Sequence, residues 1–155
     1  QSNIATLDVV KLLKDSKAAI SMKDQLNAVA KKYSEEDQKK QKEIQKQEEE
    51  LLRQKSTLTP EAFSDRKNTF EKQVIEFNKN SQNKRKALAK AEKDAVNQIE
   101  EEVEKIVKSI IETEKITAVF RNSAVILSDT TIDITDKVVD ELNKKLSNVT
   151  VSVTP

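Results

Sequence analysis

Clustered carboxylates are the residues of this chain whose types and spacing could do chemistry, because paired acids can act as general acid and general base. Three consecutive glutamates occur at residues 48–50 and again at residues 100–102. General acid–base catalysis needs a desolvated pocket that shifts the pKa of one carboxyl group, and both runs lie in segments that we expect to be exposed helix. The sequence therefore favours a solvated helix face over an active site for both runs.

The composition excludes the other common catalytic sites. The 155 residues include no histidine, cysteine, tryptophan or glycine. Glycine-rich phosphate loops, Ser-His-Asp or Cys-His nucleophiles and zinc sites each need at least one of these residue types. We therefore expect no enzyme, no cofactor and no metal site.

A basic cluster is the first pattern that could attract a partner. Residues 78–90 contain five basic side chains and no acid, although the formal net charge of the whole chain is only +1. The cluster, with the lysines expected near it on a neighbouring helix, comprises Lys39, Lys40, Lys42, Lys79, Lys84, Arg85, Lys86 and Lys90. These residues form either a solvated helix face or a surface that attracts anionic partners or lipid head groups. Nucleic acid is not expected, since no base-reading motif accompanies the charge.

An aromatic stripe is the second such pattern. Phe63, Phe70 and Phe77 are spaced one heptad apart and fall on one face of a helix. Such a stripe is more often the core of a helical hairpin than a binding surface, but a loosely packed tip could expose part of it. The candidate contact residues at this tip are Ile44, Leu51, Leu52, Phe63, Phe70 and Phe77.

Two long helices must position these residues. Residues 14–113 contain no glycine and one proline, Pro60, which predicts an antiparallel helical hairpin with its turn at residues 56–61. Apolar seams are expected at the root and near the tip. Between them, residues 34–50 contain only Ile44 as an apolar residue and residues 78–86 contain none. Because this middle buries little apolar surface, we expect it to splay or bend.

The chain ends carry β-type patterns. Residues 4–10, 115–121 and 124–127 predict strands, and a short helix is expected to begin near Thr135. These ends, residues 1–13 and 114–155, are near the lower size limit for an independent core, so we expect an oligomer. The predicted fold class is α+β, with the helical hairpin as a coiled-coil-like arm that projects from a small β-rich oligomerisation body. The apolar residues expected in this body are Ile4, Leu7, Val9, Ile116, Val119, Val125, Leu127 and Ile134.

Two terminal motifs resemble those of a known family. The segment IATLD at residues 4–8 is similar to the N-terminal strand of the Skp/OmpH family of periplasmic chaperones. The segment IDITDKVV at residues 132–139, running on to Leu142, resembles the Asp-Ile-Thr terminus of that family. The order of elements between these motifs also matches that of the family.

The resemblance implies a homotrimer whose β segments assemble a shared body, with three helical arms around a cavity. It implies an ATP-independent holdase in the periplasm that binds unfolded outer-membrane β-barrel proteins and prevents their aggregation. Anionic lipid or lipopolysaccharide could make weak contact, and nucleic acid is not a partner. A removed signal peptide would account for a chain that begins at Gln1 without Met; a trimmed sequence is the other explanation.

Two other classes remain open, and the chain departs from the family in three places. A structural coiled-coil spacer or adaptor would need a continuous apolar seam, and a prefoldin-like cytosolic chaperone carries its β segments between its helices. Relatives commonly have a glycine near residues 113–115, where this chain has Thr-Glu-Lys. Residues 44–72 hold six basic and six acidic residues, so the tip is neutral. The tail after Leu146 extends past the expected end.

Overall fold

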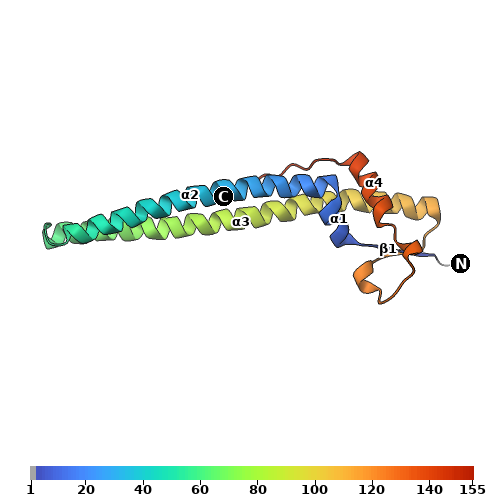
Figure 1. Ribbon diagram of the computed structural model, residues 1–155, viewed down its shortest axis with the longest axis horizontal. Helices are drawn as coiled ribbons and strands as arrows, with labels where there is room; N and C mark the ends of the chain where they lie inside the picture. The colour runs from blue at the N-terminus through green and yellow to red at the C-terminus, as the bar shows by residue number, and fades with distance from the viewer. Residues whose placement is uncertain (1–2) are drawn as a thin grey trace. The chain divides into compact units, whose positions relative to one another are not determined.

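The computed structural model describes residues 3–155 (Figure 1). In chain order the elements are β1 (Ile4–Leu7), α1 (Val9–Asp15), α2 (Lys17–Gln54), α3 (Pro60–Glu114), β2 (Ala118–Arg121), two 3₁₀ turns (Asn122–Ala124 and Thr130–Ile132) and α4 (Thr135–Lys145). They form two compact units: the first contains residues 3–26 and 91–152, and the second contains residues 27–90 and 153–155. The two long helices, α2 and α3, each contribute to both units.

The second unit contains the turn and the adjoining parts of the helical hairpin that the sequence predicts for residues 14–113. Helix α2 ends at Gln54 and α3 begins at Pro60, where the missing N–H of proline has no helical partner to lose. The hydroxyl of Thr59 accepts a hydrogen bond from the Ala62 N–H at 3.2 Å and so caps α3. Ala87 is the only buried residue of this unit, so its two helices pack through half-buried side chains.

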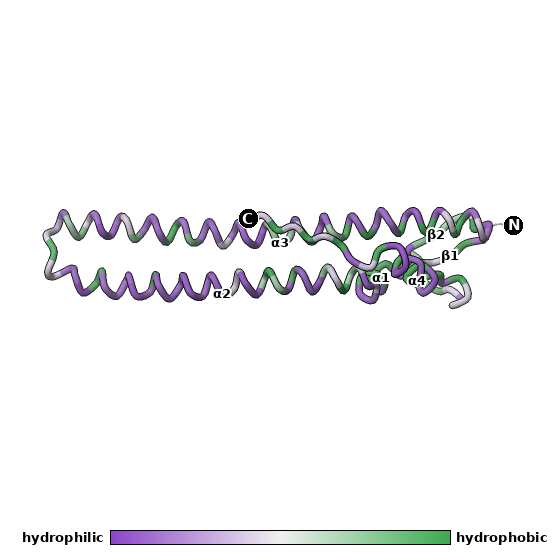
Figure 2. The backbone as a smooth tube through the Cα atoms, turned by 90° about the horizontal axis from the view of Figure 1, so that it is seen from above, coloured by the Kyte–Doolittle hydropathy of each residue, from purple (hydrophilic) through white to green (hydrophobic). Residues whose placement is uncertain are grey.

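The first unit holds the apolar core. Small residues of α2 and α3 let the two helices approach closely, and larger side chains of α1, α3 and α4 fill the remaining space. The buried core residues on these helices are Leu12, Ala18, Ala19, Met22, Ala95, Ile99, Ile106, Ile110, Val138 and Leu142. In Figure 2, hydrophilic residues dominate the two long helices near their turn, in contrast to the apolar core of the first unit. The predicted root seam is therefore confirmed.

A two-stranded parallel sheet joins the two ends of the chain. β1 pairs with β2 in the register Ile4↔Ala118 to Leu7↔Arg121, and Thr6 on β1 also bridges to Asp133. β1 thus has neighbours on both sides. Within residues 3–155 no strand pairs with the other edge of β2.

Three strand predictions need correction. The first strand ends at Leu7, because the carboxylate of Asp8 accepts a hydrogen bond from the Lys11 N–H at 2.9 Å and starts helix α1. β2 begins only at Ala118, since Lys115, with φ of 55°, lies in the left-handed region and turns the chain after α3. The structure has no strand at residues 124–127, because a 3₁₀ turn follows β2 directly and no segment among residues 3–155 pairs with them.

None of the helices described for residues 3–155 combines the length and the apolar character that crossing a membrane requires. Over the same residues, no group of three acidic side chains is arranged to hold a metal ion.

Candidate functional site

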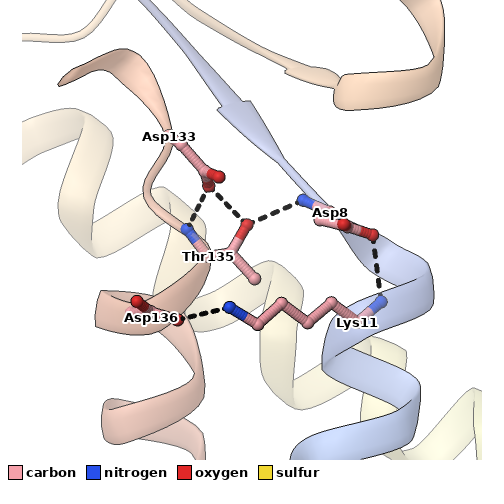
Figure 3. A network of polar contacts seen from close by, with 5 residues as sticks. All are labelled: Asp8, Lys11, Asp133, Thr135 and Asp136. Carbon is pink, nitrogen blue, oxygen red and sulfur yellow. Dashed lines mark hydrogen bonds and ion pairs between the residues drawn. The ribbon is translucent and has the colours of Figure 1, made fainter. Parts of the chain in front are cut away.

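A polar network in the first unit fastens the two chain ends together (Figure 3). The buried hydroxyl of Thr135 accepts a hydrogen bond from the Asp8 N–H at 2.8 Å and donates one to the carboxylate of Asp133. The same carboxylate accepts the Thr135 N–H at 2.8 Å, and the Lys11 ammonium lies 3.1 Å from the carboxylate of Asp136. One threonine therefore connects the start of α1 to the start of α4.

The electrostatics of this network follow from its hydrogen bonds. The bonds from the hydroxyl and then the N–H of Thr135 hold the pKa of Asp133 below its ordinary value, although partial burial opposes the shift. The hydrogen bond and the charge of Asp136 raise the pKa of Lys11. These hydrogen bonds and this ion pair connect residues 8–11 to residues 133–136, so the network has a structural role.

An apolar groove of about 410 Å³ lies beside this network in the first unit. Its walls come from β1, α1, the end of α3 and β2. The apolar lining residues are Leu7, Val9, Leu12, Leu13, Val103, Val107, Ile111, Val119 and Phe120. Leu7, Val9 and Val119, which the sequence assigned to the oligomerisation body, thus meet here. A hollow of this size with mostly apolar walls is typical of a partner or ligand site.

The loop after β2 exposes two consecutive large apolar side chains. Ile126 is 105% exposed relative to an isolated residue and Leu127 is 90% exposed. Large apolar side chains in adjacent exposed positions mark interaction surfaces. Leu127 was predicted to lie in the body, whereas Ile126 was missed, although it belongs to the same apolar run at residues 124–127. The other predicted body residues, Ile4, Ile116, Val125 and Ile134, are exposed or half-buried at the surface of the first unit.

In the second unit the predicted tip residues are divided between two environments. Ile44, Leu51, Phe63, Phe70 and Phe77 are half-buried, whereas Leu52 is exposed. The structure brings Leu51 and Phe70 together in an open groove of about 330 Å³ whose other walls are mostly polar. The aromatic stripe is therefore partly core and partly surface.

The basic cluster is reorganised by Lys84, which turns inward. Its ammonium lies 2.9 Å from Asp37 and 3.2 Å from Glu36, and 5.3 Å from the centre of the Tyr33 ring. The hydroxyl of Ser81 donates a second hydrogen bond to Asp37 at 2.8 Å. We call these five residues the Asp37–Lys84 link, because they join α2 to α3 where the apolar seam is interrupted.

The two central groups of the link shift each other's pKa. The hydrogen bond to Asp37 raises the pKa of Lys84, with desolvation opposing and Glu36 adding to the effect. Desolvation alone would raise the pKa of Asp37, but the hydrogen bonds from Lys84 and Ser81 and the charges of Lys84 and Arg85 outweigh it, so that pKa is lowered. Both groups therefore stay charged across the neutral range.

The remaining basic residues stay at the surface. Lys40 forms an ion pair with Glu43 at 3.6 Å, and Lys90 is likewise not without a partner. Within residues 3–155 the other members of the cluster are exposed and form no ion pair; they are Lys39, Lys42, Lys79, Arg85 and Lys86.

Comparison with known proteins places these features in a family. Residues 3–142 match the family described as "Outer membrane protein (OmpH-like)". The chain belongs to the OmpH-like family. The fold is that of the crystal structure of a "putative outer membrane chaperone (OmpH-like)" from Caulobacter crescentus CB15, with a TM-score of 0.91 and 16% identity over 100% of this chain and 92% of that one. No curated protein matches the sequence.

Within the OmpH-like family match, the resemblance of both terminal motifs is confirmed. The Asp-Ile-Thr motif at residues 133–135 has a visible physical role, since it supplies the network of Figure 3. The match ends at residue 142, so the last thirteen residues of this chain lie outside it. The Asp37–Lys84 link was missed; its signal in the sequence is a tyrosine and an acid on α2 that the expected hairpin register places opposite the basic cluster.

Proposed function

We propose that this OmpH-like chain is an ATP-independent holdase of the periplasm that binds unfolded outer-membrane β-barrel proteins and prevents their aggregation. Membership of the family supports a chaperone role. The observation that carries the proposal is the packing of the second unit, where Ala87 alone is buried and the aromatic stripe stays half-exposed. Such a surface offers many weak contacts to an unfolded chain, in place of one shaped pocket.

The proposal includes a homotrimer assembled through the first unit. Three features support it: the apolar groove of about 410 Å³, the unpaired edge of β2, and the exposed pair Ile126 and Leu127. Open sheet edges and exposed apolar pairs are unfavourable in an isolated chain and are commonly covered by a partner. A neighbouring copy could extend the sheet with residues 124–127 and so give this segment the strand partner that it lacks within residues 3–155.

Clients would contact the second unit in the cavity that three hairpins enclose. The groove containing Leu51 and Phe70, together with the exposed Leu52 and Ile75, provides apolar contacts. The unpaired basic residues around Arg85 provide attraction for acidic client segments and for anionic lipid or lipopolysaccharide. Arms that close loosely can adapt to clients of different size.

The test is an aggregation assay. A urea-denatured outer-membrane β-barrel protein is diluted into buffer with and without the chain, and light scattering is followed. We expect scattering to fall to the level of folded client at one trimer per client. Unchanged scattering at this ratio refutes the holdase function. Sedimentation equilibrium on the same sample measures the mass, and a monomer at micromolar concentration refutes the trimer.

A further inference from the structure

Two glutamines hold the C-terminal tail against the helices of the first unit. After α4 the chain continues as an extended segment along α2 and α3 (Figure 2). The side-chain amide of Gln25 on α2 donates to the carbonyl of Val149 at 2.8 Å and accepts from the N–H of Val151 at 3.3 Å. Gln98 on α3 donates to the carbonyl of Thr150 at 3.3 Å. All three bonds engage the main chain of the tail.

The side chains of the tail alternate between burial and exposure. Val149 is buried in the core cluster and Val151 packs against it, whereas Thr150 and Ser152 are exposed. This period of two is that of a β-strand with one apolar face. Main-chain hydrogen bonds supply affinity for any sequence, and the positions of the two valines select for apolar residues at alternate positions.

The tail therefore shows what kind of ligand this face accepts. Gln25 satisfies a carbonyl and an N–H two residues apart, which is the pattern that an extended chain presents on one side. The transmembrane strands of β-barrels have the same alternation of apolar and polar residues as Val149–Thr150–Val151–Ser152. The tail lies beyond residue 142, where the family match ends.

We propose that the face carrying Gln25 and Gln98 binds an extended polypeptide segment with apolar residues at alternate positions, and that the chain's own tail occupies it as a displaceable stand-in. The ligand is a strand-forming segment of an unfolded client, and in this respect the inference rests on the proposed function. The tail lowers the affinity for clients until a segment with a better fit or a higher local concentration replaces it.

Direct binding of a labelled peptide tests this site. The probe is a fluorescent peptide with the sequence of residues 146–155, and its anisotropy is measured with three proteins: the full chain, a chain ending at Ser147, and the full-length double variant Val149→Asp/Val151→Asp. A tethered segment acts at a millimolar effective concentration, so freeing the face should tighten peptide binding about tenfold or more in both altered proteins. Equal affinity for all three proteins overturns the proposal.

Two controls separate recognition from general stickiness. A peptide of the same composition with its three valines adjacent lacks the alternation and should bind at least about tenfold more weakly. In the chain ending at Ser147, Gln25→Ala should weaken binding, whereas Gln41→Ala, on an exposed part of the same helix, should not. Equal binding of the two peptides, or unchanged binding after Gln25→Ala, contradicts the assignment.

Folding of the altered chains is checked by far-ultraviolet circular dichroism and thermal melting. If both the shortened chain and the Asp variant unfold, the tail is a permanent part of the core and the proposal fails. The aggregation assay keeps the two proposals apart. Suppression of aggregation without peptide binding refutes this site alone, whereas peptide binding without suppression by any of the three proteins refutes the holdase function alone.

Discussion

Replacing Asp37 by asparagine and Lys84 by methionine, singly and together, measures how strongly the polar link joins the two helices of the second unit. The double-mutant cycle isolates the interaction between the two side chains, because each single variant removes it while keeping a similar shape. The matched control cycle uses Lys40→Met and Glu43→Gln, whose ion pair of 3.6 Å lies within α2 and does not reach α3.

The size of the coupling follows from exposure. The side chains of Asp37 and Lys84 are 32% and 19% exposed, whereas both members of the control pair are 48% exposed. Exposed pairs contribute about 0.2–1 kcal/mol and breaking a fully buried pair costs about 3–5 kcal/mol, so the half-buried link should contribute about 1–1.5 kcal/mol. The control pair should contribute about 0.3–0.5 kcal/mol.

Amide hydrogen exchange is the suitable assay, because it reports local opening of the second unit as well as global unfolding. We expect single replacements at the link to speed exchange of residues 78–87 by about tenfold. A coupling energy no larger than that of the control pair refutes the reasoning, since the middle of the hairpin would then be held by something other than the link.

The pH dependence of the link has a defined sign. The lowered pKa of Asp37 means that its contribution is present above the ordinary value of 3.8 and is lost as the pH falls through the lower folded value. The raised pKa of Lys84 means that its contribution is present below 10.5 and is lost as the pH rises through the higher folded value. The coupling measured between about pH 5 and pH 9 should therefore be constant.

Three further replacements test the first unit, the assembly and the client surface. Thr135→Val leaves the Asp8 N–H unpaired and should lower the free energy of unfolding by about 1–3 kcal/mol in urea titrations at fixed protein concentration. Ile126→Asp with Leu127→Asp should reduce the sedimentation mass from trimer to monomer, whereas Ile75→Asp in the second unit should leave it unchanged. Phe70→Asp should weaken client holding severalfold in the aggregation assay at unchanged mass; unfolding of α3 would instead assign Phe70 to the core.

The helical hairpin could be predicted because its signals are local. The absence of glycine and the position of Pro60, the one proline of residues 14–113, determine where helices can run and where the chain must turn. A turn at residues 56–61 pairs the part of α2 around Tyr33 with the basic cluster on α3, and the Lys84 ammonium lies 5.3 Å from the centre of the Tyr33 ring. The position of the turn, which local residues determine, thus sets which residues of the two helices lie opposite each other.

The strand predictions were weaker because alternation identifies a face without identifying its partner. Val9 and Val10 continue the alternating pattern of β1, yet the cap formed by Asp8 turns them into helix. Residues 124–127 are four consecutive apolar residues, but no segment among residues 3–155 pairs with them and Ile126 is exposed. Whether such a segment becomes a strand depends on a pairing partner, which the pattern alone cannot specify.

The candidate surfaces depend on side chains that carry no signature in the sequence. Gln25 is one of many glutamines in α2, and only the course of the tail distinguishes it from the others. Lys84 belongs to a basic run, and only the approach of Asp37 makes it a structural residue. Long-range side-chain contacts such as these follow from the assembled fold.

The interrupted seam explains how one pair of helices can serve two purposes. In the first unit, alanines and large aliphatic residues interlock and exclude water, which favours a permanent core. In the second unit, the contact between Asp37 and Lys84 is polar, so separating the two side chains exposes charges that water can hydrate and no apolar surface. An apolar contact at the same place would hold the two helices together more tightly. If the helices separated there, however, they would expose apolar side chains that promote association with neighbouring molecules. A polar link joins α2 to α3 without such an apolar surface, which is the property that the proposed holdase function requires.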